Sequence, residues 1–434
     1  MVQVAIIGGG VIGCAVGLEL ARRGTQAHVI DRNGEVGHGS TSASCGIVRR
    51  FYSTRTMTGM AHEGAAVWAD WQSYLRAPDG ADLARFERPG MLFIPPAIDD
   101  RVRGIVAHMR ELGVKVEILT PAEVAERFPF MDIASHAPVR DPNDEDFADD
   151  TGREIAGAVF EPDAGYVVSP LIAARDLRSA GEREGVRFHL GCGVAALRAG
   201  AAPGPRFRLT LDDGSALDAD VVVNVAGPHS SLVNRMAGVE LPIETRPLRR
   251  EVCAVGNPTW SESDGSTIPV VGDLDSGIYF RPESGGRDLI VGSLDPACDT
   301  FEWVDDPDAL DPSCSVAAHE RQVMRLMKRL PEVRFGPRRG IAGLYDVTPL
   351  DWNPIIDRTD TPGYYVAIGT SGSSFKTAPV IGQVMAELIG ACEAGRDHDA
   401  DPLHVILPRT GFDLDVSFFT RLRSARPSTG TVIG

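Results

Sequence analysis

The chain is long, acidic and of ordinary globular composition. It has 434 residues, of which 43% are hydrophobic and 24% charged, and its net charge is −17. This length predicts two domains, and the charge excludes nucleic acid or an anionic membrane as the main partner, because both would repel the chain. No apolar stretch reaches the roughly 20 residues that span a bilayer. Seven cysteines without metal-type spacing predict a cytoplasmic protein with reduced thiols.

The first thirty residues contain a dinucleotide-binding pattern. Its parts are a strand at 4–7, the turn Gly8-Gly9-Gly10-Val11-Ile12-Gly13, an apolar helix, a strand at 28–30 and Asp31. Gly8 permits the tight turn, Gly10 lets the backbone approach a pyrophosphate, and Gly13 lets the helix close onto the strand. The phosphates would lie at the helix N-terminus, and Asp31 would accept a hydrogen bond from a ribose hydroxyl.

A loop of small residues follows at 39–46, and Arg49, Arg50 and Tyr52 come directly after it. Such a density of small residues lets the backbone pack against a flat ligand and offer it N–H groups. Arginine side chains supply a planar fork that suits a carboxylate. Taken alone, the segment is compatible with a surface loop carrying solvated arginines or with a site for a flat ligand and a carboxylate.

Two later blocks repeat the order of strand, small-residue turn and helix, at 220–227 and at 364–376. Separated by long inserts, they predict a discontinuous Rossmann-like α/β domain and a second α+β domain with a mostly antiparallel sheet. The expected division is 1–82, 151–240 and 341–420 for the nucleotide-binding domain, 83–150 and 241–340 for the substrate domain, and 421–434 for a flexible tail. An acidic run at 141–154 is expected to be a solvated loop.

Taken together, these motifs resemble the flavin-dependent amine and D-amino-acid oxidase superfamily, and most closely its sarcosine oxidase and glycine oxidase-like branch. The resemblance rests on the opening turn, on the segment 39–52, on 223–227 and on 371–376, and it extends from the first strand to about residue 390. It implies FAD bound in extended form. The isoalloxazine ring is expected between the loop at 39–45 and the turn at 369–376.

The resemblance also implies which residues hold the cofactor. They are Gly8, Gly10, Val11, Ile12, Gly13, Asp31, Arg32, Gly39, Ser40, Thr41, Ser44, Cys45, Gly46, Val194, Ala226, Gly227, Gly343, Gly372, Ser373, Ser374, Phe375 and Lys376.

For the substrate, the resemblance assigns Arg49 to the carboxylate, Lys376 to an assisting role, and Tyr52 and Tyr345 to the pocket wall. Two cations and two phenols can hold a small carboxylate-bearing amine against the flavin. The expected reaction is hydride transfer from the neutral amine to flavin N5, followed by hydrolysis of the imine in water. No general base is required if the amine binds deprotonated.

Several positions depart from the family pattern. Gly343 stands where monomeric sarcosine oxidases have the cysteine bonded to the flavin, so the FAD is expected to be non-covalent. Ile290 stands in place of the lysine that promotes reaction with oxygen, and Leu294 in place of a nearby histidine. An apolar residue cannot stabilise a developing superoxide, so O2 and another electron acceptor both stay open. Gly46 stands where the family has a second arginine, which leaves room for a different or larger substrate.

Sequence alone leaves several alternatives open. The substrate can be a 2-hydroxy acid or a polyol phosphate, since related folds host both chemistries. The chain can be one subunit of a larger amine-oxidising complex that passes electrons to a partner subunit. A flavin-holding scaffold and an NAD(P)-dependent dehydrogenase are two further alternatives. The roles of Arg50 and His229 stay unassigned.

Overall fold

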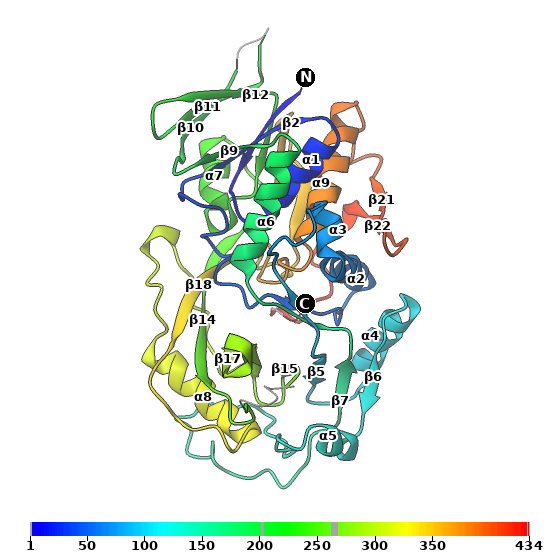
Figure 1. Ribbon diagram of the computed structural model, residues 1–434, viewed down its shortest axis with the longest axis vertical. Helices are drawn as coiled ribbons and strands as arrows, with labels where there is room; N and C mark the ends of the chain where they lie inside the picture. Colours follow the sequence, from blue (N-terminus) through cyan, green and yellow to red (C-terminus); the bar gives the residue numbers. More distant parts are fainter. Residues whose placement is uncertain (1, 201–203, 262–267, 432, 434) are drawn as a thin grey trace.

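One half of the fold is built on a six-stranded sheet in the order β19-β20-β13-β1-β2-β9 (Figure 1). The computed structural model describes residues 2–200, 204–261, 268–431 and 433. The strands are β1 (Gln3–Ile7), β2 (Gln26–Asp31), β9 (Arg187–Leu190), β13 (Val221–Asn224), β19 (Ile355–Arg358) and β20 (Tyr364–Ile368). Neighbours are parallel except β19 and β20.

Both faces of this sheet are covered, which is why its strands are continuously apolar. In β1, Val4 and Ile6 join one apolar cluster while Ala5 and Ile7 join another, because successive strand side chains point to opposite faces. The first cluster includes α1 and α9; α6 packs on α1, and α2 on α9. The second lies under a small sheet of β10, β11 and β12 and helix α7. These elements are α1 (Val11–Arg22), α2 (Arg55–Ala69), α6 (Pro170–Arg183), α9 (Ala378–Glu393), β10 (Val194–Ala199), β11 (Phe207–Leu211), β12 (Ala216–Ala219) and α7 (Ser230–Met236).

The other half is built on an eight-stranded sheet in the order β18-β14-β17-β16-β15-β5-β7-β6 (Figure 1, lower half). The strands are β5 (Met91–Ile94), β6 (Glu117–Leu119), β7 (Ala158–Glu161), β14 (Arg246–Gly256), β15 (Val270–Asp273), β16 (Ile278–Glu283), β17 (Asp288–Ser293) and β18 (Gly340–Val347). Only β15 and β5 pair in parallel among these described strands. The mostly antiparallel sheet predicted from the sequence is therefore present.

This sheet extends past the boundaries expected from the sequence. Strands β7 and β18 pair into it, although their residues lie largely in the segments 151–240 and 341–420. The reason is that turn signals locate a strand but do not show which sheet it joins. Helix α8 (Val316–Arg329) covers one face of the sheet, and α4 (Asp100–Glu111) packs with the cluster on the other.

Shorter elements complete the described chain. They are β3 (Ile47–Val48), β4 (Phe86–Glu87) and β8 (Gly165–Val167), which form a small sheet, the pair β21 (His404–Ile406) and β22 (Asp413–Asp415), helices α3 (Trp71–Leu75) and α5 (Pro121–Arg127), and the 3-10 turns η1 (Gly227–His229), η2 (Ser284–Gly286), η3 (Pro307–Ala309) and η4 (Val416–Phe419). In the part of the chain described, no helix combines the length and the apolar character that crossing a membrane requires.

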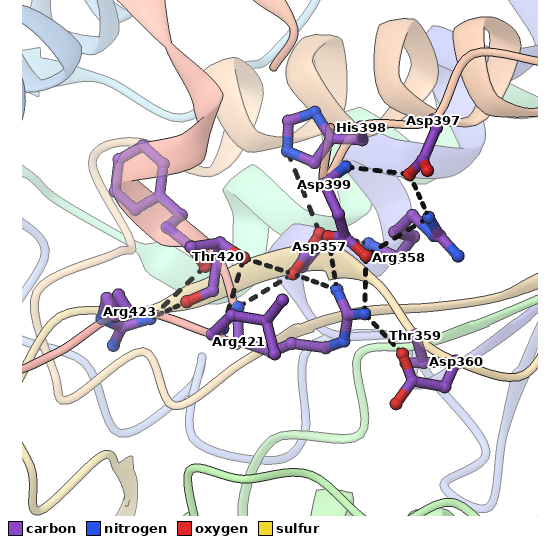
Figure 2. A network of polar contacts seen from close by, with 12 residues as sticks. Asp357, Arg358, Thr359, Asp360, Asp397, His398, Asp399, Thr420, Arg421 and Arg423 are labelled. Carbon is purple, nitrogen blue, oxygen red and sulfur yellow. Dashed lines mark hydrogen bonds and ion pairs between the residues drawn. The ribbon is translucent and has the colours of Figure 1, made fainter. Parts of the chain in front are cut away.

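The start of the C-terminal segment is anchored by buried ion pairs, so the flexible tail expected from residue 421 is wrong there. Arg421 donates to Asp357 at 3.0 Å and to Asp399 at 2.8 Å, and its side chain is 2% exposed (Figure 2). Arg423 donates to both carboxylate oxygens of Asp351, at 2.9 and 3.0 Å. The polar composition of this segment predicted a flexible tail. Their acidic partners lie more than twenty residues away in sequence, so only folding reveals the pairing.

Candidate active site

A cavity of about 680 Å³ lies where the two halves of the fold meet, a volume typical of small-molecule sites. Four segments that are far apart along the chain line it together: the glycine turn, the loop at 39–46, the residues 342–346 and the turn at 370–376. The opening glycine turn and the late Ser-Gly and Phe-Lys turn therefore meet at one cavity, as the flavin hypothesis requires.

The glycine turn has no room for side chains where the backbone approaches the cavity. Gly8 has φ +118°, and a Cβ there would lie 2.4 Å from the carbonyl oxygen of Val225. A Cβ at Gly13 would lie 1.9 Å from the carbonyl oxygen of Gly8, so Gly13 allows the helix to pack against the strand. Gly13 does not itself line the cavity, in contrast to the other residues assigned to the cofactor, all of which do.

The N-terminus of α1 is open to a negatively charged ligand. Within the described chain, its N-cap residue Gly10 makes no side-chain cap, and the first turn contains no acidic residue. Val11 N–H donates to Thr41 Oγ1 at 3.1 Å, which ties the loop at 39–46 to this turn. The positive end of the helix dipole thus borders the cavity with no protein carboxylate in the first turn to neutralise it.

Asp31 ends β2 at the cavity wall, and its carboxylate is fixed in place. One oxygen accepts a hydrogen bond of 2.6 Å from Gly9 N–H. The other accepts from the backbone N–H of Asn33 at 2.8 Å and from its side-chain amide at 2.9 Å. A carboxylate oxygen accepts more than one hydrogen bond, so this geometry fits a ribose hydroxyl beside the turn.

The mouth of the cavity is bridged by a contact that the sequence did not indicate. Asp308, on η3, pairs with Arg32 and accepts a hydrogen bond from His229 Nε2 at 2.9 Å. All three residues line the cavity. Hydrogen bonds from Arg32 and His229 lower the pKa of Asp308 to about 2. Arg32 was assigned to the cofactor, and in this structure its guanidinium also joins the two halves of the fold.

Two buried cations line the opposite end of the cavity. Arg49 is 5% exposed and Lys376 is 4% exposed. The Arg49 guanidinium stacks over the Tyr52 ring at 4.1 Å. The Lys376 ammonium donates to Tyr52 Oη and to the carbonyl of Ser373, both at 2.8 Å. The sequence-predicted cations are thus brought together on a shared aromatic support.

Tyr52 itself does not line the cavity, which corrects the expected position of this residue. It is 1% exposed and lies beneath the two cations. Burial raises the pKa of Tyr52, but Arg49 and Lys376 outweigh burial and lower it. Burial, together with Arg49, lowers the pKa of Lys376, and Tyr52 partly opposes that shift.

Tyr345 lines the cavity as expected, but its surroundings were missed. Arg250 of β14 lies over its ring at 5.5 Å and pairs with Asp295. Burial raises the pKa of Tyr345 to about 12, although Arg250 opposes the shift, so the phenol stays neutral and can donate a hydrogen bond. Tyr279 is also in the cavity wall, and its hydroxyl oxygen lies 3.0 Å from Cys45 Sγ. Arg250 and Tyr279 come from strands without a sequence motif, which is why no pattern revealed them.

Two positions that depart from the family pattern lie in different places. Leu294 lines the main cavity, whereas Ile290 borders a second cavity of about 390 Å³ on the other side of the loop at 42–45. Arg281 holds this loop from behind by donating to the Cys45 carbonyl at 2.7 Å. The Arg50 side chain is paired with the buried Glu161, so Arg50 has a structural role.

The comparisons with known proteins agree with this geometry. The family model described as FAD dependent oxidoreductase matches residues 3–388. The chain is 24% identical to the glycine oxidase of Geobacillus kaustophilus (strain HTA426), over 91% of this chain and 94% of that protein. It is 25% identical to sarcosine oxidase subunit beta of an Arthrobacter species, over 90% of this chain and 88% of that protein.

Among solved structures, the L-proline dehydrogenase of P. horikoshii superposes with a TM-score of 0.75 and 21% identity, over 98% of this chain and 99% of that chain. The crystal structure of glycine oxidase from Geobacillus kaustophilus gives a TM-score of 0.70 at 21% identity, over 92% of this chain and 98% of that chain. At these identities the structures show a shared fold. The family match extends over most of the sequence, and the chain therefore belongs to the FAD-dependent oxidoreductase family.

Proposed function

We propose that this FAD-dependent oxidoreductase oxidises the C–N bond of an amino acid or of a secondary or tertiary amine that carries a carboxylate. The observation that supports this most directly is the pair of buried cations, Arg49 and Lys376, in the wall of the cavity that also contains the phosphate-binding turn. A guanidinium and an ammonium side by side in a cavity wall attract an anionic ligand and can donate hydrogen bonds to a carboxylate. Two relatives are described as a glycine oxidase and a sarcosine oxidase subunit, and glycine and sarcosine are amines of this class.

Each residue at this end of the cavity has a distinct part. Arg49 offers a planar fork to the substrate carboxylate, and Lys376 adds a second positive charge. Tyr345, neutral at physiological pH, donates a hydrogen bond into the same space. Together they orient the substrate so that its reactive C–H bond faces the cofactor, and they do so in a site where little water weakens the charges.

The cofactor is held by the rest of the cavity. Asp31 takes a ribose hydroxyl, and the open N-terminus of α1 takes the phosphates. When bound there, the flavin supplies a two-electron acceptor for the hydride that leaves the substrate carbon. A Cβ at Gly343 would lie 2.7 Å from the Cβ of Ala43, and glycine has no nucleophilic side chain. We therefore propose non-covalent FAD.

The electron acceptor is a separate question. Leu294 brings an apolar side chain to the cavity wall, and Ile290 brings another to the second cavity, beyond the loop at 42–45. Neither can stabilise a developing superoxide by charge. This supports a dehydrogenase with an acceptor other than O2, or with a partner subunit that receives the electrons. Comparing turnover with O2 and with an artificial dye acceptor distinguishes this from an oxidase.

The function is tested by anaerobic reduction of the purified holoenzyme. The panel contains N-methyl and cyclic amino acids, the matching amines without a carboxylate, and the matching 2-hydroxy acids. We expect bleaching of the flavin absorption by members of the first group alone. Bleaching by hydroxy acids instead would overturn amine oxidation. Equal bleaching by amines without a carboxylate would overturn the roles given to Arg49 and Lys376.

A further inference from the structure

The C-terminal segment returns to the active-site cavity after its anchored start. Ile433 is 4% exposed and lines the cavity. Its side chain belongs to the apolar cluster that also contains Met91, Tyr279 and Leu294, and these three residues line the same cavity. The last segment, red in Figure 1, lies between the upper and lower halves of the molecule. The C-terminal segment thus supplies part of the cavity wall.

The backbone of the same residue contacts the proposed carboxylate anchor. Arg49 Nη2 donates a buried hydrogen bond of 3.0 Å to the Ile433 carbonyl. Arg49 Nη1 donates to the carbonyl of Phe51. Two carbonyls on different segments therefore fix the plane of the guanidinium, because its N–H groups point in set directions. Ile433 N–H in turn donates to Thr431 Oγ1 at 3.3 Å.

The start of the C-terminal segment is held in a fixed position by ion pairs. Upstream, Arg421 and Arg423 are 2% and 7% exposed, and each is paired with a buried carboxylate. Figure 2 shows the pairs that Arg421 makes. A buried ion pair is costly to break, since each unpaired charge would remain desolvated. The C-terminal segment therefore starts from a fixed point in the fold.

We propose that Ile433 is a specificity-determining residue: its side chain sets the width of the substrate pocket beside Arg49, and its carbonyl orients the guanidinium. The inference rests on the proposed function, because it gives Arg49 the substrate carboxylate. The C-terminal segment then limits the size of the substrate, together with the two sheets. Shortening this side chain widens the pocket, and enlarging it narrows the pocket.

The test uses the holoenzyme and two carboxylates of different width, acetate and phenylacetate, whose binding is followed by the change in flavin absorption. We expect Ile433→Ala to increase the affinity for phenylacetate relative to acetate by about tenfold, because three methylene equivalents are removed from an apolar wall. Ile433→Phe should change the ratio in the opposite direction. Ile406→Ala is the matched control, since Ile406 is 61% exposed on β21, and its ratio should equal that of the wild type.

The outcomes separate the two proposals. If the wild type binds both carboxylates and the ratio is unchanged in Ile433→Ala and Ile433→Phe, the role of Ile433 is overturned and the proposed function stands. If the wild type binds neither carboxylate while Arg49 is intact, the proposed function fails and this inference fails with it. Ile433→Val removes a single methylene and should shift the affinity ratio in the same direction as Ile433→Ala, by a smaller factor. This variant is used if the larger substitutions reduce the flavin content.

Discussion

The ammonium of Lys376 donates a 2.8 Å hydrogen bond to the hydroxyl of Tyr52, and both side chains are almost fully buried. The two residues are 324 positions apart in the sequence, on segments that meet only in the folded chain. The Arg49 guanidinium stacks over the Tyr52 ring at 4.1 Å. Tyr52 therefore acts as a positioning residue that lets two like charges share one end of the cavity.

Tyr52→Phe should shift the pH dependence of carboxylate binding. Tyr52 opposes the lowering of the Lys376 pKa that burial and Arg49 cause, so its loss lowers that pKa further. Affinity for acetate, which requires the ammonium, should then fall at a lower pH than in the wild type. The measurement is the dissociation constant of acetate between pH 7 and 10. The control is Tyr365→Phe, which removes a buried hydroxyl that is hydrogen-bonded to Glu393 outside the cavity; its pH profile of acetate binding should equal that of the wild type. If Tyr52→Phe also has the wild-type profile, the role given to the contact between Tyr52 and Lys376 is contradicted.

Arg49→Ala should raise the KM for the amine substrate strongly. The same change should lower the melting temperature of the flavin-bound protein only slightly. A charge-assisted contact of this kind contributes about 2–4 kcal/mol, which corresponds to roughly 30- to 1,000-fold in kcat/KM. Arg49→Lys should recover a small part, because it restores the charge without the planar fork. Steady-state kinetics with the best amine provide the measurement, and Arg198→Ala, at an exposed position on β10, is the control. Unchanged amine kinetics in Arg49→Ala would show that the carboxylate binds elsewhere.

The flavin should be released when the protein is denatured. No thiol is available at Gly343, so acid precipitation should leave all yellow colour in the supernatant, with FAD identified by chromatography. A yellow pellet would instead reveal a covalent bond at another residue. The same experiment gives the FAD content per chain.

Asp308→Ala should accelerate the loss of FAD by removing the bridge across the cavity mouth. The partners are half-exposed, with side-chain exposures of 52% for Asp308 and 51% for Arg32, so solvent screening limits the effect to about 1 kcal/mol or less, roughly fivefold. The rate is measured from the rise in free flavin fluorescence on dilution. High salt should shrink the difference from the wild type. The exposed neighbour Asp305, changed to Ala, is the control, and equal rates in both variants would exclude the bridge.

Asp346 should make the protein less stable as the pH rises from 4 to 7. Burial raises its pKa to about 7, against the ordinary value of 3.8, so in this range the folded state holds a proton that the unfolded state has released. By linkage, the free energy of unfolding then falls with increasing pH. Asp346→Asn removes this contribution.

The stability of the variant relative to the wild type should increase by about 2–3 kcal/mol between pH 5 and pH 8. Urea unfolding at the two pH values checks this, with the exposed Asp82→Asn as control. A difference between wild type and Asp346→Asn that does not change with pH would contradict the raised pKa.

The sequence by itself determined the nucleotide-binding end of the protein. A strand, a glycine turn, a helix and a terminal acid are contiguous, and their geometry follows from local sterics and backbone hydrogen bonding. The positions of Gly8, Gly10 and Asp31 in the site therefore follow from the sequence alone. The same holds for the small-residue loop and the Ser-Gly and Phe-Lys turn, which resemblance to a known family placed on either side of the flavin.

Only the tertiary structure decided which residues complete the other end. Tyr52 lies under the cations because Arg49 and Lys376 come from distant segments that fold onto it. Arg250 packs over the Tyr345 ring from a strand without a motif, and Ile433 reaches the cavity wall from a segment whose composition indicates a loose tail. Both positions depend on long-range pairing, of buried charges at the start of the C-terminal segment and of strands across the eight-stranded sheet. Such long-range pairing depends on which surfaces are buried against each other in the folded chain. A local sequence pattern cannot predict which surfaces these are.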